Sequence, residues 1–183
     1  MSNFRLLKIT IVLGVFSLVV MSCFKDVDFE QAQEIQLSPD LQVDLLYYNV
    51  NKLNFTNSGT NEFTPVIRDT VRLEFLDDDY IQEDLMFAEL RFRHENQFPY
   101  LIRSKIKFLS ANDMTQFSVN YDIPPGSMDA IAVVDTLRVL ETDEIGKLRR
   151  SIKMFIELEL IDGGEDPEGE LNFSSKGLFK FEF

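Results

Sequence analysis

The chain has 183 residues, with 31 Asp and Glu against 18 Lys and Arg and a formal net charge of −13. A chain this acidic repels phosphate backbones and anionic headgroups, which argues against nucleic acids as partners. Its length suits one well-buried core and does not require two folded domains. The 17 Phe and the absence of Trp favour a Phe-packed β core over an aromatic platform for sugars.

Residues 1–22 have the layout of an export signal. Arg5 and Lys8 give a positive start, residues 9–20 form an apolar run, and Ser22 is a small residue at its end. A membrane-spanning helix needs about 20 apolar residues, and this run is shorter. We therefore predict a signal peptide over 1–22, with a short hydrophobic anchor as the alternative.

Cys23 is the only cysteine, so no intramolecular disulfide can form. The sequence Val20-Met21-Ser22-Cys23 resembles the lipobox of bacterial lipoproteins, which are cut just before the cysteine. The resemblance implies that Cys23 becomes the mature N-terminus and carries diacylglycerol on its sulfur and an acyl chain on its nitrogen. Several acyl chains make a durable membrane anchor. The alternative is a buried cysteine at a helix end.

Residues 23–40 are polar, rich in Gln and Glu, and end in Ser-Pro-Asp, which predicts a tether after the lipid. The start of this tether resembles the export signal that sends Bacteroidota lipoproteins to the cell surface. The matching residues are Lys25, Asp26, Asp28 and Glu30, with Val27 interrupting the acidic cluster. The resemblance implies an outer-membrane protein displayed on the cell surface. The alternative is the periplasmic face, with a tether that is acidic because the whole chain is acidic.

Residues 41–183 alternate between apolar and polar side chains with period two, which indicates strands that have one core face and one water face. The clearest stretches are 71–75, 86–93, 102–108, 117–121, 152–160 and 179–183. Turn signals separate them at 57–59, 96–99, 124–126 and 163–164. We predict an all-β domain, a single antiparallel β-sandwich over 41–183. Its core should contain Phe92, Phe108, Phe117, Ile156 and Phe181.

One short helix is expected near 142–150. Thr142 can cap it, acidic residues follow in the first turn, and Lys147, Arg149 and Arg150 lie in the last turn, an order that complements the helix dipole. Ile145 and Leu148 share one face. We expect this helix to close one end of the sandwich.

Residues 89–108 resemble the strand, Asn-x-Phe-Pro, strand hairpin of late-embryogenesis-abundant, water-stress-type β-sandwiches. The matching residues are Phe92, Asn96, Phe98, Pro99 and Ile106. The wider layout, a lipobox followed by a Phe-rich sandwich, resembles uncharacterised outer-membrane lipoproteins of the Bacteroidota. These resemblances imply a fold and a compartment but no activity.

Two tripeptides resemble the Bacteroidota O-glycosylation sequon, Asp-Ser/Thr-aliphatic. They are Asp69-Thr70-Val71 and Asp135-Thr136-Leu137. The resemblance implies that Thr70 and Thr136 can carry a glycan. The alternative is that both are ordinary polar positions at strand starts, where Thr is favoured.

No catalytic motif stands out. His94 is the only histidine and shares a face with Leu90 and Phe92 next to a turn, as a strand-end histidine would. No Gly-x-Ser-x-Gly, phosphate-binding Gly-rich loop or Cys/His metal spacing occurs. A glycosidase-type carboxylate pair stays open, because such a pair is defined by separation in space. We expect no catalytic residue, no metal site, no cofactor and no small-molecule substrate, and hence no enzyme.

Two acidic clusters could supply oxygen ligands to Ca²⁺, since this ion prefers carboxylates on Gly-containing loops. They are residues 77–79 and the set Asp162, Glu165, Asp166, Glu168 and Glu170. Neither has EF-hand spacing, and solvated acidic turns are the simpler interpretation.

These observations favour a non-catalytic lipoprotein that serves as an accessory or structural subunit of an outer-membrane complex for transport, secretion or insertion. The alternative is a surface module that binds a glycan or a host surface, with or without Ca²⁺. That alternative predicts an exposed aromatic patch. Its candidate residues are Tyr47, Tyr48, Tyr80 and Tyr100.

Overall fold

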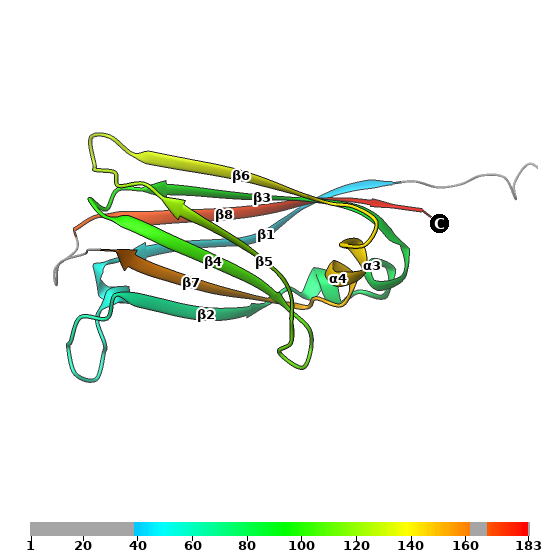
Figure 1. Cartoon of the computed structure of the whole chain (residues 1–183), viewed down its shortest axis with the longest axis horizontal. Helices are drawn as coiled ribbons and strands as arrows, with labels where there is room; N and C mark the ends of the chain where they lie inside the picture. Colours follow the sequence, from blue (N-terminus) through cyan, green and yellow to red (C-terminus); the bar gives the residue numbers. More distant parts are fainter. Residues whose placement is uncertain (1–38, 162–167, 183) are drawn as a thin grey trace, which may run out of the picture. The chain divides into compact units, whose positions relative to one another are not determined.

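The computed structural model describes residues 39–161 and 168–182. Most of these residues belong to eight strands (Figure 1). The strands are β1 (Asp40–Asn51), β2 (Val66–Arg72), β3 (Leu85–Asn96), β4 (Leu101–Leu109), β5 (Thr115–Ile123), β6 (Ala132–Leu140), β7 (Lys153–Ile161) and β8 (Glu170–Phe181). The signal peptide predicted over 1–22 lies outside the described residues, as does the tether apart from its last two residues.

The strands form two four-stranded sheets that pack face to face, with orders β1-β8-β3-β6 and β2-β7-β4-β5. All neighbouring strands are antiparallel. The predicted antiparallel β-sandwich is therefore confirmed. Among the described strands, β4 and β5 alone are consecutive in sequence and paired in one sheet, and this repeated crossing between sheets gives the strand order of a jelly roll.

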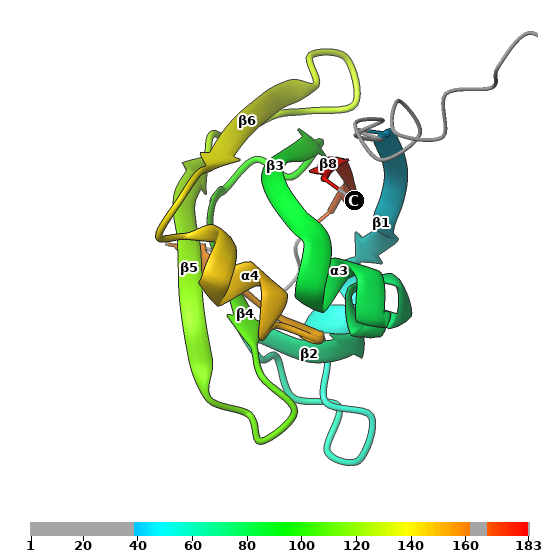
Figure 2. The same ribbon diagram turned by 90° about the vertical axis from the view of Figure 1, so that its right-hand side faces the viewer.

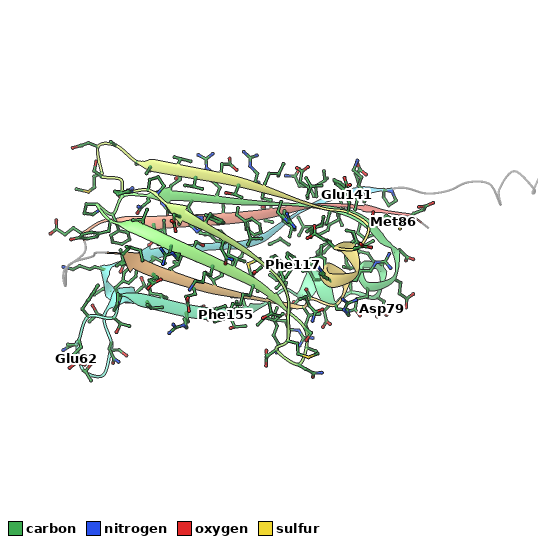
Figure 3. All side chains as sticks on the ribbon, in the orientation of Figure 1. Glu62, Asp79, Met86, Phe117, Glu141 and Phe155 are labelled. Carbon is green, nitrogen blue, oxygen red and sulfur yellow. The ribbon has the colours of Figure 1, made fainter. Side chains whose placement is uncertain are left out.

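The core follows the predicted alternation in the strands that have a neighbour on both sides. Phe92, Phe108, Ile156 and Phe181 are buried as expected. Phe117 is only partly buried because it lies on the edge strand β5, where its ring stacks on Phe108 with centroids 4.4 Å apart (labelled in Figure 3).

The predicted alternation is wrong at two places, at Met86 and at residues 73–75. Met86 was expected on the core face but is exposed, because a register shift between Leu85 and Phe87 turns it outward. The alternation at 71–75 also does not continue as a strand. β2 ends at Arg72, and the 3₁₀ helix η2 (Glu74–Asp77) follows.

The turn expected as a hairpin at 96–99 is instead a corner between the two sheets, since β3 and β4 belong to different sheets. The buried Asn96 side chain holds this corner. Its amide nitrogen donates to the carbonyl oxygens of Phe98, Tyr100 and Pro124 at 3.3, 3.3 and 2.8 Å. Its amide oxygen accepts from the Phe98 N–H at 2.9 Å. One side chain therefore ties three backbone segments together.

The described residues contain two short α-helices where one was expected. Helix α4 (Ile145–Arg149) lies within the predicted range 142–150, and its Ile145 and Leu148 are buried. Thr142 does not cap it, because Thr142 has φ of 45° and the N-cap residue is Glu144. The second helix, α3 (Asp79–Asp84), was missed. Figure 2 shows α3 and α4 at the same end of the sandwich, which α4 helps to close as predicted.

A further 3₁₀ helix, η1 (Lys52–Phe55), follows β1 and buries Phe55. Neither α-helix in the described part of the chain has the length and apolar character needed to cross a membrane.

Candidate functional site

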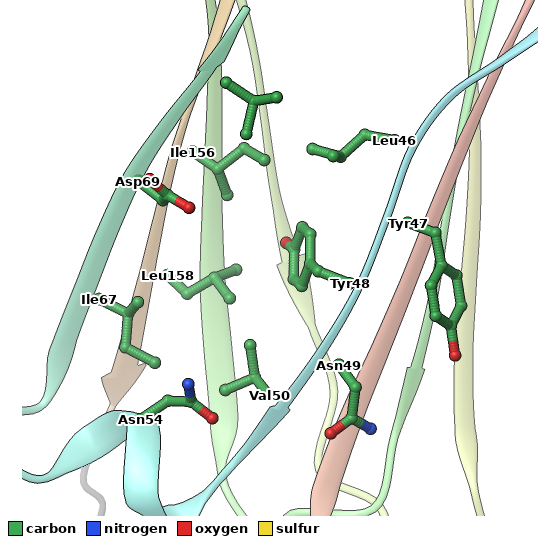
Figure 4. A pocket seen from close by; sticks show the side chains of 11 residues that line it. Leu46, Tyr47, Tyr48, Asn49, Val50, Asn54, Ile67, Asp69, Ile156 and Leu158 are labelled. Atoms are coloured by element: carbon green, nitrogen blue, oxygen red, sulfur yellow. The ribbon is translucent and has the colours of Figure 1, made fainter.

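A pocket of about 290 Å³ opens between β1 and β2, which are the edge strands of the two sheets on the same side of the sandwich (Figure 4). Aliphatic side chains from β1, β2 and β7 make most of its wall. They are Leu46, Val50, Ile67, Val71, Ile156 and Leu158. The polar residues around it are Tyr47, Tyr48, Asn49, Asn54 and Asp69, of which Tyr47 and Asn49 turn their side chains to the outer face of the sheet. The pocket was not predicted, although Leu46, Tyr48 and Val50 alternate with polar residues and could have indicated β1.

One residue that lines the pocket, Tyr48, belongs to a polar layer inside the sandwich. In one sheet, Tyr48, Phe173 and His94 are paired across β1, β8 and β3. In the other, Ile67, Leu158, Ser104 and Tyr121 are paired across β2, β7, β4 and β5. We call Tyr48, His94, Ser104 and Tyr121 the polar layer. Most of the buried residues around it are apolar.

His94 lies in this layer near the end of β3, as predicted, and is fully buried. Its ring centroid is 4.5 Å from that of Phe173, and its Nδ1 lies 3.1 Å from the Tyr121 hydroxyl. Burial lowers the pKa of His94 to about 3, so the imidazole is neutral at physiological pH. A neutral imidazole without a carboxylate partner does not form a catalytic triad.

Three buried side-chain atoms in the described residues make no hydrogen bond, and all three belong to the polar layer. They are the Tyr48 hydroxyl, His94 Nε2 and the Ser104 hydroxyl. Tyr48 stacks on Phe173 with centroids 4.6 Å apart, and burial raises its pKa well above the usual value. Tyr48 as a residue is half-buried, and its hydroxyl is fully buried. Each unpartnered polar group lowers the stability of the fold, by roughly 1–3 kcal/mol.

Tyr47 is the one exposed member of the predicted aromatic set. Its side chain is 70% exposed on the outer face of the sheet that contains β1. It borders a shallow depression of about 200 Å³ with Arg93, Asn172 and Ser174. Tyr80 packs against Phe75 and Phe181, and Tyr100 is half-buried. The four tyrosines therefore do not form one patch.

The outer face of the edge strand β6 carries an apolar row. Val133, Leu137 and Val139 are 49%, 53% and 39% exposed, and we call them the β6 row. Asp135 lies between them and accepts from Arg91 Nε and Nη2 at 2.7 and 2.5 Å. This ion pair neutralises the charge within the row and helps to lower the pKa of Asp135.

The two predicted glycosylation threonines lie inside strands and not at strand starts. Thr70 is exposed in β2, on the opposite face from the pocket residues Asp69 and Val71. Thr136 is half-buried in β6 and pairs with the core residue Phe92. Of the two, Thr70 is the accessible one. Cys23 and the export residues Lys25, Asp26, Asp28 and Glu30 lie outside the described residues.

The first acidic cluster does not form a single loop. Asp77 pairs with Arg72, and Asp79 begins α3. In the second cluster, Glu168 and Glu170 belong to the described residues and Asp162, Glu165 and Asp166 do not. Within 39–161 and 168–182, no group of three or more His, Cys, Asp or Glu side chains is placed to hold a metal ion.

No family model matches the chain, and no curated protein matches it. Several solved structures resemble it at low identity. A Parabacteroides distasonis protein described as secreted is 15% identical with a TM-score of 0.41, over 64% of this chain and 38% of that one. The VP2 subviral particle of infectious bursal disease virus is 12% identical with a TM-score of 0.47, over 79% and 32%. The enzymatically active domain of tailspike protein 4 from bacteriophage CBA120 is 14% identical with a TM-score of 0.39, over 78% and 19%. The chain spans less than two fifths of each of these proteins.

Proposed function

We propose that this chain is a non-catalytic lipoprotein, anchored in the outer membrane through Cys23 and displayed on the cell surface. There it acts as an accessory or structural subunit of a transport, secretion or insertion complex. The lipobox residues support the anchor, and the run from Lys25 to Glu30 supports surface display. The observation that carries the subunit role is the β6 row.

An edge strand has one unpaired side, and charged residues normally protect it from pairing with other chains. β6 pairs with β3 alone, and its outer face presents Val133, Leu137 and Val139 to solvent. Its one acidic side chain there, Asp135, is already paired with Arg91. An apolar, charge-neutralised edge is suited to contact with an apolar segment of a partner protein, by strand addition or by packing on the row.

Affinity purification from detergent-solubilised outer membranes of a Bacteroidota host tests this role. The chain should retain a stoichiometric outer-membrane partner, and a Val133→Asp/Leu137→Asp variant should lose it. Met114→Asp is the matched control, because Met114 is 61% exposed in the turn between β4 and β5, away from the row. A monomer without a partner, or equal capture by the β6 variant, contradicts the proposal.

The anchor and the topology are tested separately. Cys23→Ala should leave the precursor uncleaved and unlabelled by a palmitate analogue. Protease treatment of intact cells should remove the domain while periplasmic markers survive. Lys25/Asp26/Asp28→Ala should protect it again until the outer membrane is permeabilised. Normal maturation of Cys23→Ala would refute the lipid anchor, and protection of the original chain in intact cells would refute surface display.

A second candidate function is glycan or host-surface binding, which the exposed Tyr47 favours. An exposed aromatic face beside Arg93, Asn172 and Ser174 combines a stacking surface with hydrogen-bonding groups, as sugar recognition requires. A glycan array with and without EDTA is the test. Binding that disappears in Tyr47→Ala supports this function, and loss with EDTA adds a role for Ca²⁺. An array without any signal excludes the glycans that it contains.

A further inference from the structure

The pocket between β1 and β2 has the size of a small ligand site. Its volume of about 290 Å³ is nearly twice that of an apolar cavity of about 150 Å³ that binds benzene. By this comparison it has room for about ten non-hydrogen atoms. Six aliphatic side chains line it, so contact with a hydrocarbon chain would remove apolar surface from water on both sides.

The pocket also has a polar group without a partner. Figure 4 shows the Tyr48 ring extending from β1 into the space between the sheets, and its hydroxyl is buried there without a hydrogen bond. A phenol hydroxyl can donate and accept, so it can pair with a hydroxyl or carbonyl group of a ligand. His94 Nε2 and the Ser104 hydroxyl, also unpartnered, lie in the same layer.

The lining limits the charge of the ligand. Asp69 is the only Asp, Glu, Lys, Arg or His among the residues that line the pocket, and it would repel an anion. An ionised carboxylate brought next to Tyr48 would lose its hydration without gaining a cation, which is strongly unfavourable. A fatty-acid anion is therefore a poor ligand, whereas an uncharged group of the same length is not.

We propose that this pocket binds an uncharged aliphatic molecule, with its chain against Val50, Ile67 and Leu158 and a hydroxyl or carbonyl group on the Tyr48 hydroxyl. This inference is independent of the subunit role, because the pocket lies at the β1/β2 side of the sandwich and the β6 row at the opposite edge of the β1 sheet.

The test compares 1-octanol with octanoate at pH 7.5, by NMR titration of a chain that starts at residue 24. This chain keeps all the described residues and lacks the lipidated cysteine. We expect 1-octanol to shift the resonances of Tyr48, Ile156 and Leu158, with intermolecular NOEs to their side chains. Octanoate should bind at least 10-fold more weakly.

Three variants make the result specific. Tyr48→Phe keeps the ring and its stacking on Phe173, and should weaken 1-octanol binding about 3- to 10-fold through one lost hydrogen bond. Val71→Phe should abolish binding by filling the pocket. Thr70→Phe is the matched control, because Thr70 is the adjacent residue on the opposite face of β2, and it should leave binding unchanged.

The proposal is overturned if 1-octanol gives no shifts at these residues or if octanoate binds equally well. It is also overturned if Tyr48→Phe binds 1-octanol as tightly as the original chain. Should Val71→Phe fail to fold, the Tyr48→Phe titration and the NOEs decide the matter without it. Failure here leaves the partner-capture experiment on the β6 row unaffected, and the reverse is also true.

Discussion

Replacing Asn96 by Ala should destabilise the fold by about 3–4 kcal/mol, far more than the small change in side-chain volume suggests. Asn96 is fully buried at the corner between β3 and β4, and its amide makes four hydrogen bonds to backbone groups. The side chain therefore substitutes for the strand pairing that the backbone lacks where it passes from one sheet to the other.

The magnitude follows from the individual bonds. Removing the amide oxygen leaves the buried Phe98 N–H unpaired, which is worth roughly 1–3 kcal/mol. The 2.8 Å bond to the Pro124 carbonyl contributes about 1 kcal/mol more. The two bonds of 3.3 Å are longer than ideal and together add less than about 1 kcal/mol.

Urea denaturation followed by far-UV circular dichroism measures this loss on the chain that starts at residue 24. Asn120→Ala is the control, because Asn120 is exposed on β5 and its replacement should change stability by less than about 0.5 kcal/mol. The slope of free energy against urea should be the same for both. A loss below 1 kcal/mol in Asn96→Ala would show that the corner is held by packing and not by the amide.

Three further predictions use the same assay. Phe92→Ala should cost about 3–5 kcal/mol, since its ring is fully buried between Phe108 and Phe173; a loss under 1 kcal/mol would mean that the core closes around the gap. Gly126→Ala should prevent stable folding, because an added Cβ would lie 1.9 Å from the Asn96 carbonyl oxygen. A variant with unchanged stability would show that residue 126 does not approach Asn96 this closely. The pKa of His94 is lowered from 6.5 to about 3, so below about pH 6.5 the unfolded chain binds more protons than the folded chain. The folded state therefore becomes less stable as the pH decreases. From pH 7.5 to 5 the loss should be about 2 kcal/mol, and His94→Gln should remove most of it; an equal pH dependence in both chains would exclude His94 as its source.

The sequence predicts the strands in which apolar residues face the core and polar residues face water. The prediction fails where apolar residues face outward or where long-range packing determines the structure. β7 was recognised because it carries alternation over its whole length. β6 was not recognised because its apolar residues, such as Leu137, face outward, and no period-two rule separates a core face from an exposed apolar one. α3 was missed because residues 77–79 have the composition of an acidic turn. The helix is held in place by Ile81, whose side chain is buried at the end of the sandwich.

Long-range pairing explains the remaining misses. The order of strands depends on which edges meet, and no local pattern near Asn96 distinguishes a hairpin from a corner between sheets. The pocket follows from this topology, because Tyr48 and Ile67 face each other only when β1 and β2 are edges on the same side. His94 could be placed at a strand end from the sequence, but its neighbours Ser104 and Tyr121 come from strands of the other sheet.

The position of β1 has a mechanical consequence for an anchored protein. Its first residue, Asp40, pairs with Lys180 at the end of the β1–β8 ladder, and β6 lies at the opposite edge of the same sheet. If the proposed lipid anchor and the proposed partner at β6 both hold the chain, tension between them would cross three ladders in series. A pull directed across the sheet would open the first ladder from its Asp40 end, one pair at a time, and low forces suffice for such peeling. β1 would then separate from β8 first, while the ladders β8–β3 and β3–β6 stayed paired. The β1–β8 ladder would therefore limit the force that the domain can transmit.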